Sequence, residues 1–151
     1  MDKEFFVSEM DKNSGMMFRV AYTILRNPDD CRDAIQEAAL KAWAKRKGLR
    51  EESRFIPWLM RILVNECYSL RRKAPLHVPL EQIPEPAQPP PDPTLAMALH
   101  ALPEKLRLPL MLQYAEGMEY KEIAAVLHLP QSTVRGRIHR AKMLLRKELE
   151  A

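Results

Sequence analysis

Prolines divide this chain into two parts. Eight of the 13 prolines in the 151-residue sequence fall between Pro75 and Pro93. Residues 75–92 also contain three acidic residues and no Lys or Arg. Because proline fixes the φ angle and lacks the amide hydrogen that helix interiors need, such a stretch predicts an extended linker. We therefore expect two lobes, residues 1–74 and 93–151, joined by a linker over residues 75–92.

Both lobes are basic. Residues 1–74 carry 15 basic and 11 acidic side chains, and residues 93–151 carry 9 and 6. The formal net charge of the chain is +4, which favours a polyanionic partner such as a nucleic acid. With only four glycines in the sequence, no phosphate-binding glycine loop can be written.

The periodicity of the apolar residues predicts an all-α fold of two small helical domains. Apolar residues recur at helical spacing, and no segment shows sustained alternation with a period of two. In the first lobe we expect three helices. The first is capped by Asn13 or Ser14 and stopped by Asn27-Pro28. The second is capped by Asp29. The third starts near Pro57 and ends near Arg72.

The second lobe is expected to begin with two short helices. The first covers Leu95–Leu102 and the second covers Glu104–Glu116, with Gly117 as its stop. Pro109 lies inside the second helix, where it should kink the helix or shift its start.

The strongest local pattern is a helix-turn-helix between Tyr120 and Ile138. Ile123, Ala124 and Leu127 supply the inner face of one helix, and Val134 and Ile138 supply that of the next. Pro130 opens the second helix. His128 occupies the turn position where a left-handed backbone is needed, which histidine tolerates better than β-branched residues do.

The outward face of this second helix is polar and basic. From residue 131 to 147 there are six basic residues and no acidic one, a charge pattern that fits a phosphate-lined major groove. The alternative is an ordinary solvated face on a helical hairpin. The candidate DNA-binding residues on it are Gln131, Ser132, Thr133, Arg135, Gly136, His139 and Arg140.

A second candidate surface lies on the third helix of the first lobe. Aromatic and cationic residues alternate there, as in platforms that stack the bases of a single strand and neutralise its phosphates. The alternative makes the aromatic residues core and the arginines plain surface. The candidate residues are Arg54, Phe55, Trp58, Arg61 and Asn65.

Catalytic, metal and membrane functions are not indicated. Cys31 and Cys67 have neither a CxxC spacing nor a companion His motif, so we expect two reduced thiols packed in helices. The four histidines are scattered, and no catalytic triad or paired carboxylate emerges. Apolar runs such as Ile62-Leu63-Val64 are far shorter than a membrane span. We therefore expect a cytoplasmic protein that is no enzyme and takes no cofactor or metal.

Three segments together resemble bacterial sigma factors of the extracytoplasmic-function (ECF) group, over the whole chain. Asp29 to Trp43 resembles region 2.2 of that family, and Phe55 to Asn65 resembles its regions 2.3 to 2.4. Leu102-Pro103-Glu104, with the helix-turn-helix and Arg140-Ala141-Lys142, is similar to region 4. The three motifs in this order, separated by a linker, are far more specific than any one of them.

The resemblance implies a transcription initiation factor that binds core RNA polymerase and promoter DNA. Region 4 would read the −35 element as duplex through Arg135, Gly136, His139 and Arg140. Region 2 would capture the −10 element as a melted single strand through Arg61 and Asn65, with the loop from Lys47 to Phe55 as the pocket for an extruded base. The polymerase-binding residues would be Asp33, Gln36 and Glu37. By resemblance we also expect an anti-sigma factor as a partner.

Three residues depart from the pattern of the family. Gly136 stands where Ser is frequent, and His139 stands where larger side chains are common, so the −35 sequence is not defined by the resemblance. Pro57 replaces a polar residue such as Thr next to the loop that selects the −10 base. The linker occupies the place of region 3.

Two other classes of function compete with this interpretation. One is a stand-alone helix-turn-helix regulator that binds duplex DNA as a dimer, which leaves the helix from Trp58 to Asn65 and the linker without a role. The other is an enzyme, for which the sequence supplies no catalytic arrangement.

Overall fold

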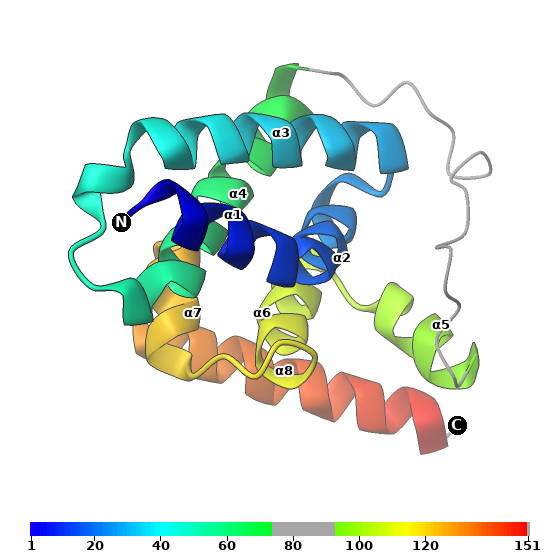
Figure 1. The fold of residues 1–151 in the computed structure, drawn as a ribbon. Helices are drawn as coiled ribbons and strands as arrows, with labels where there is room; N and C mark the ends of the chain where they lie inside the picture. Colours follow the sequence, from blue (N-terminus) through cyan, green and yellow to red (C-terminus); the bar gives the residue numbers. More distant parts are fainter. Residues whose placement is uncertain (74–92, 151) are drawn as a thin grey trace. The chain divides into compact units, whose positions relative to one another are not determined.

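The computed structural model describes residues 1–73 and 93–150. The regular elements within these two ranges are all helical, which confirms the all-α prediction. The chain divides into two compact units, whose main parts are the helices before and after the predicted linker (Figure 1). The linker itself, residues 75–92, lies outside the described residues.

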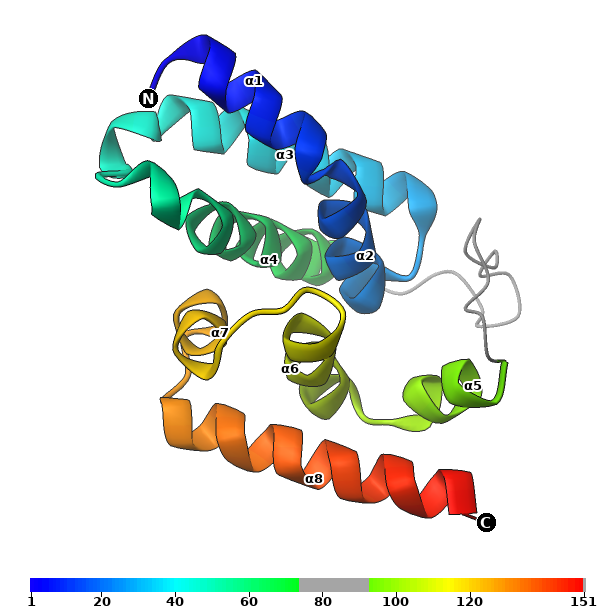
Figure 2. The same cartoon turned by 60° about the horizontal axis from the view of Figure 1, so that its bottom comes forward.

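The first unit is a small helical bundle. Figures 1 and 2 show its two longest helices, α3 and α4, running side by side, with α1 and α2 packed against them. Its elements in chain order are α1 (Lys3–Lys12), α2 (Ser14–Leu25), α3 (Pro28–Ala44), the short 3-10 turns η1 (Arg46–Gly48) and η2 (Glu52–Arg54), and α4 (Phe55–Lys73).

Helix α1 is absent from the three helices that the sequence predicts for this lobe. It begins at Asp2, whose side chain caps it by accepting a hydrogen bond of 2.8 Å from the amide of Phe5. Phe6 is its one buried residue. A ten-residue helix that buries a single side chain has no repeating apolar face, so periodicity could not detect it.

The cap of α3 also differs from the prediction. Asn27, and not Asp29, is the N-cap, and its side-chain oxygen accepts hydrogen bonds from the amides of Asp29 and Asp30. Pro28 then occupies the first helical turn, where its missing N–H costs nothing. The residues read as a stop for α2 therefore start α3. Helix α2 ends at Leu25, and its C-cap residue Arg26 lies in the left-handed region at φ 55°.

The start of α2 agrees with the prediction, since Asn13 is its N-cap residue and the helix begins at Ser14. The Asn13 side chain makes no capping bond, however, and its amide nitrogen donates to the carbonyl of Glu9 at 2.7 Å. The start of α4 departs from expectation. Helix α4 begins at Phe55, two residues before the expected Pro57, and Pro57 is accommodated in its first turn.

The second unit consists of α5 (Pro93–Ala101), α6 (Glu104–Tyr114), α7 (Tyr120–Leu127) and α8 (Gln131–Glu150). Pro109 lies inside α6 and does not shift its start from the predicted Glu104. Gly117 ends the α6 region at φ 67°, and its amide donates to the carbonyl of Gln113. A non-glycine residue would be strained there.

The turn between α7 and α8 has the predicted geometry. His128 adopts a left-handed conformation at φ 56°, and its amide and that of Leu129 both donate to the carbonyl of Ala124. The amides of Thr133 and Val134 then donate to the carbonyl of Pro130, which opens α8. Ile123, Ala124, Val134 and Ile138 are buried, as predicted. Leu127, the fifth predicted inner residue, is only half-buried, and its neighbour Val126 is buried instead.

Replacing the α3 cap tests the observed boundary against the expected one. We expect Asn27→Ala to lower the free energy of unfolding by about 1 kcal/mol, because two backbone amides lose their acceptor. Asp29→Ala should cost much less, since Asp29 makes only a highly exposed ion pair with Arg32. Urea unfolding followed by tryptophan fluorescence measures both losses, as both tryptophans of the sequence lie in this unit. Equal losses would argue for Asp29 as the cap.

Two glycines of the second unit provide a matched pair of substitutions. A Cβ atom would meet nothing within 4 Å at either Gly117 or Gly136, so their difference lies in backbone conformation alone. We expect Gly136→Ala to stabilise the protein by about 1 kcal/mol, because glycine is unfavourable in a helix interior. Gly117→Ala should destabilise it, because φ is positive there. Thermal unfolding followed by circular dichroism distinguishes the two, and shifts of the same sign would contradict both assignments.

Candidate nucleic-acid interface

Over residues 131–141, helix α8 separates its apolar and polar residues onto opposite faces. Val134, Ile138 and Ala141 point into the unit and are fully buried. The predicted DNA-binding residues lie on the other side, at helical spacing. Six of them are exposed and Thr133 is half-buried; the exposed ones are Gln131, Ser132, Arg135, Gly136, His139 and Arg140. The fold therefore brings all seven predicted residues onto one surface, the α8 face.

Two cations of α8 rest on aromatic rings of the same unit. The Arg135 guanidinium lies 5.3 Å from the centre of the Tyr120 ring, and the Lys142 ammonium lies 5.0 Å from that of Tyr114. A hydrogen bond to Tyr114 also raises the pKa of Lys142. Such contacts restrict the side chains without neutralising their charge. Arg135 is thus a partly ordered cation of the α8 face, and Lys142 is a second ordered cation further along the helix.

Helix α4 carries the second predicted surface. Trp58, Arg61 and Asn65 follow one another at spacings of three and four residues, and Arg54 precedes Trp58 by four. Arg54, Arg61 and Asn65 are exposed and Trp58 is half-buried. These four side chains therefore form one stripe, the α4 stripe.

Phe55 is a correction to the predicted single-strand surface. Its side chain is 1% exposed, and its ring lies 5.7 Å from that of Phe5 and 5.8 Å from that of Trp58, measured between ring centres. A ring packed in this way has no free face on which a base could stack. For Phe55 the structure supports the alternative of a core residue.

The predicted polymerase-binding residues lie together on α3. Asp33, Gln36 and Glu37 are all exposed, while Ala34 and Ala38 on the opposite side of the helix are buried. We call these three residues, together with Leu40, the α3 face.

Leu40 extends this face and was not among the predicted residues. It is 67% exposed, and it follows Gln36 by four residues and Glu37 by three. A large apolar side chain within a polar helix face is a common feature of binding surfaces. The spacing alone could have placed it there, but only the packing shows that it is uncovered.

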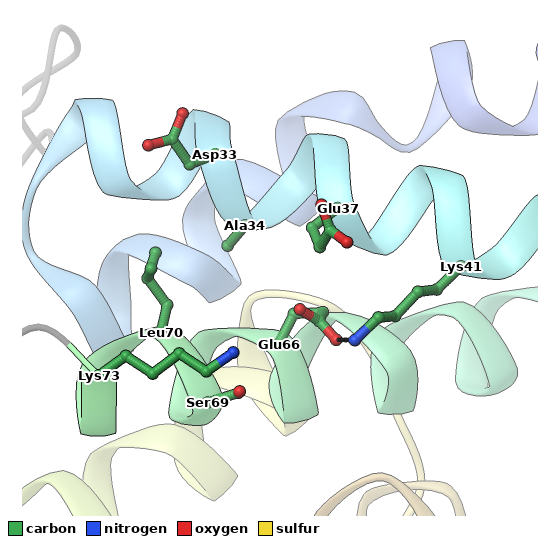
Figure 3. A pocket seen from close by; sticks show the side chains of 8 residues that line it. All are labelled: Asp33, Ala34, Glu37, Lys41, Glu66, Ser69, Leu70 and Lys73. Atoms are coloured by element: carbon green, nitrogen blue, oxygen red, sulfur yellow. Dashed lines mark hydrogen bonds and ion pairs between the residues drawn. The ribbon is translucent and has the colours of Figure 1, made fainter.

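A shallow groove of about 210 Å³ runs between α3 and α4 next to the α3 face (Figure 3). Lys41 reaches across it from α3 and forms an ion pair with Glu66 of α4. The hydrogen bond to Glu66 raises the pKa of Lys41. The remaining lining residues are Asp33, Ala34, Glu37, Ser69, Leu70 and Lys73. The groove therefore carries both signs of charge and has no concentrated anion- or cation-binding site.

The cysteines are free and buried in α3 and α4, as predicted. Burial raises the pKa of both Cys31 and Cys67 to about 12, which makes them poor nucleophiles at neutral pH. Within residues 1–73 and 93–150, no three His, Cys, Asp or Glu side chains are grouped to hold a metal ion. Among the described helices, none combines the length and apolar character needed to cross a bilayer.

Family models match both parts of the chain. The model for sigma-70 region 2 matches residues 10–75, which include α2, α3 and α4, and the model for sigma-70 region 4 matches residues 94–145, which include α6 and α7. The second match also contains the predicted DNA-binding residues of α8.

Curated relatives and solved structures agree with these matches. The chain is 30% identical to the ECF RNA polymerase sigma-E factor of Haemophilus influenzae, over 93% of this chain and 82% of the relative. It is 27% identical to the ECF RNA polymerase sigma factor SigW of Bacillus subtilis, over 98% of this chain and 90% of the relative. It is also similar to the sigma factor RpoE of Bartonella quintana, solved in complex with the anti-sigma factor NepR, with a TM-score of 0.80, 28% identity and 97% coverage of both chains.

A helical unit with the region 2 motifs thus precedes a helix-turn-helix unit with the region 4 motifs, and the relatives share this order over almost the whole chain. The protein belongs to the ECF sigma factors of the sigma-70 family, which are transcription initiation factors that direct RNA polymerase to promoters.

Proposed function

We propose that this sigma factor reads the −35 element as duplex through the α8 face and captures the −10 element as a melted single strand through the α4 stripe. The assignment of the single strand to α4 and of the duplex to α8 rests on one observation. Helix α4 contains Trp58 and Tyr68, whereas α8 contains no Phe, Trp or Tyr among its 20 residues. Bases stack on aromatic rings only when their faces are free, as in a single strand. Base pairs in a duplex present only their edges.

The α8 face is suited to the major groove. That groove is about 12 Å wide, which admits one α-helix. Arg135 and Arg140 are the candidates for guanine edges, and Gln131 and His139 lie on the same face to contact bases or phosphates. Gly136 is exposed and has no side chain, so the DNA can approach the helix closely at that point. Thr133 and Ser132 lie in the first turn, where phosphate contacts are favourable.

The α4 stripe is suited to an unpaired strand. Trp58 is partly accessible for stacking, and Arg54 and Arg61 flank it with positive charge. Asn65 supplies a donor and an acceptor that can pair with a base edge. The loop from Lys47 to Phe55 precedes the stripe directly and forms the pocket for the extruded base, with the Phe55 ring as part of its foundation.

We assign the α3 face to core RNA polymerase. Its carboxylates and amide provide specificity, and Leu40 provides an apolar contact one turn after Gln36 and Glu37. The relationship to the Bartonella sigma factor solved with NepR supports an anti-sigma factor as a further partner. We expect the protein to act in the cytoplasm, without a catalytic step or cofactor of its own.

The proposed division predicts opposite defects for two substitutions. Asn65→Ala should impair promoter opening, measured by permanganate reactivity of the −10 thymines, and should leave binding to closed duplex unchanged. Arg140→Ala should weaken duplex binding by about 1 to 3 kcal/mol if it reads a base. Arg146→Ala removes an equal charge from the far end of α8 and is the matched control. Equal losses in both assays for either variant would refute its assignment.

The docking surface predicts that Leu40→Asp abolishes most of the affinity for core RNA polymerase. Loss of a large apolar contact that an interface buries typically weakens binding by about tenfold or more. Val7→Asp is the matched control, because Val7 is also exposed in this unit, at 55%, and belongs to α1, which contributes no residue to the α3 face. Fluorescence anisotropy of the labelled full chain against core polymerase measures both. If both variants bind like the wild type, the α3 face is not the polymerase site.

A further inference from the structure

The loop between α3 and α4 has no core of its own. No residue from 45 to 54 is buried. Its backbone hydrogen bonds are local, from Gly48 to Lys45 at 2.8 Å, from Leu49 to Arg46 at 3.2 Å and from Arg54 to Glu51 at 3.0 Å. Segments with few buried contacts open at little free-energy cost. The shape of this loop must therefore be set by what holds its two ends.

Aromatic rings hold both ends. Trp43 lies just before the loop and Phe55 just after it, and Phe6 of α1 contacts both. The centre of the Phe6 ring lies 5.1 Å from that of Trp43 and 6.1 Å from that of Phe55. Both distances fall in the range of favourable ring pairs. Phe6 is 8% exposed, so it joins the two ends of the loop from within the unit.

Contacts on either side of Phe6 extend this arrangement. Asp2 caps α1 at the amide of Phe5, the residue directly before Phe6, and so orders the turn that carries the ring. At the start of the loop, the Arg46 guanidinium lies 4.0 Å from the centre of the Trp43 ring. It also donates a hydrogen bond of 2.8 Å to the carbonyl of Trp43. A continuous series of contacts therefore runs from Asp2 at the start of α1, through the rings of Phe6 and Trp43, to Arg46 at the start of the loop.

We propose that Phe6 is a positioning residue for promoter selectivity, which holds the 45–54 loop in the shape that selects the −10 base. This inference rests on the proposed capture of the −10 strand and adds that α1, outside the loop and the stripe, determines how well bases are discriminated. Phe6 itself does not contact DNA. Removing its ring breaks the link between Trp43 and Phe55, although Phe5 still packs on Phe55. The start of the loop is then no longer held against its end, so the pocket should accept several bases where the wild type prefers one.

The test uses holoenzyme assembled from core RNA polymerase and the full chain. Templates carry randomised −35 and −10 positions together, and sequencing of the transcribed templates gives the base preference at each position. We expect Phe6→Ala to reduce the preference at the −10 positions by fivefold or more, with the −35 preferences unchanged. The −35 positions thereby serve as an internal reference in every reaction.

Further variants separate positioning from stability. Phe18→Ala is the matched control, because Phe18 stacks on Tyr22 at 6.1 Å in the same unit and takes no part in the ring contacts of Phe6. It should keep both sets of preferences. Phe6→Tyr retains the ring and should restore selectivity. Asp2→Ala leaves the ring in place but weakens the cap of α1, so it should give an intermediate loss and keeps the test valid if Phe6→Ala fails to fold.

Tryptophan emission provides an independent signal. The two tryptophans of the sequence, Trp43 and Trp58, lie on either side of the loop. Emission should shift to longer wavelength in Phe6→Ala and stay unchanged in Phe18→Ala, because only the former exposes Trp43.

Two results would overturn the inference in distinguishable ways. If Phe6→Ala lowers total transcription but keeps the −10 preferences, Phe6 has only a structural role, while the proposed function stands. If the wild type itself shows preferences at the −35 positions alone, the proposed −10 capture fails, and the inference fails with it.

Discussion

The close packing of α3 against α4 is the constraint on which the first unit depends. Helix α3 turns a row of alanines spaced by four residues, Ala34, Ala38 and Ala42, into the core, and each is almost fully buried. Small side chains let helix backbones approach closely, which favours the observed packing of α3 against α4. Only their outer sides remain for partners. The α3 face and the α4 stripe are therefore products of the same packing, and we assign them to polymerase and DNA respectively.

In the second unit, the turn between α7 and α8 determines which side of α8 is exposed. His128, in a left-handed conformation, ends α7, and the amides of His128 and Leu129 both donate to the carbonyl of Ala124. Ile123 before this sharp reversal and Val134 and Ile138 after it are all fully buried. The outer side of α8 is thereby left as a polar and basic surface. Its position depends on the turn, because a residue that resists positive φ would move the start of α8.

Sequence patterns predicted the elements that bury a repeating apolar face. They failed where a single contact determines whether a helix forms or where it begins. The helix-turn-helix, four of its five predicted inner residues and the conformation of His128 were predicted correctly, since several residues contribute to each signal. The exception is Leu127, which is half-buried while Val126 is buried. Helix α1 was missed because Phe6 alone is buried, and the cap of α3 was wrong because Asn27 and Asp29 are equally good caps in isolation. The choice between them depends on where Pro28 falls.

The sequence by itself determined the helical class, the two basic lobes and the residue types available for DNA, because periodicity, charge and turn chemistry are local properties. Tertiary structure alone decided which of these side chains are accessible. Phe55 became core because Phe5 and Phe6, some fifty residues earlier in the chain, pack on it, and Leu40 stayed uncovered because no helix of its own unit covers that side of α3. Burial depends on contacts between residues distant in sequence, which no local pattern records.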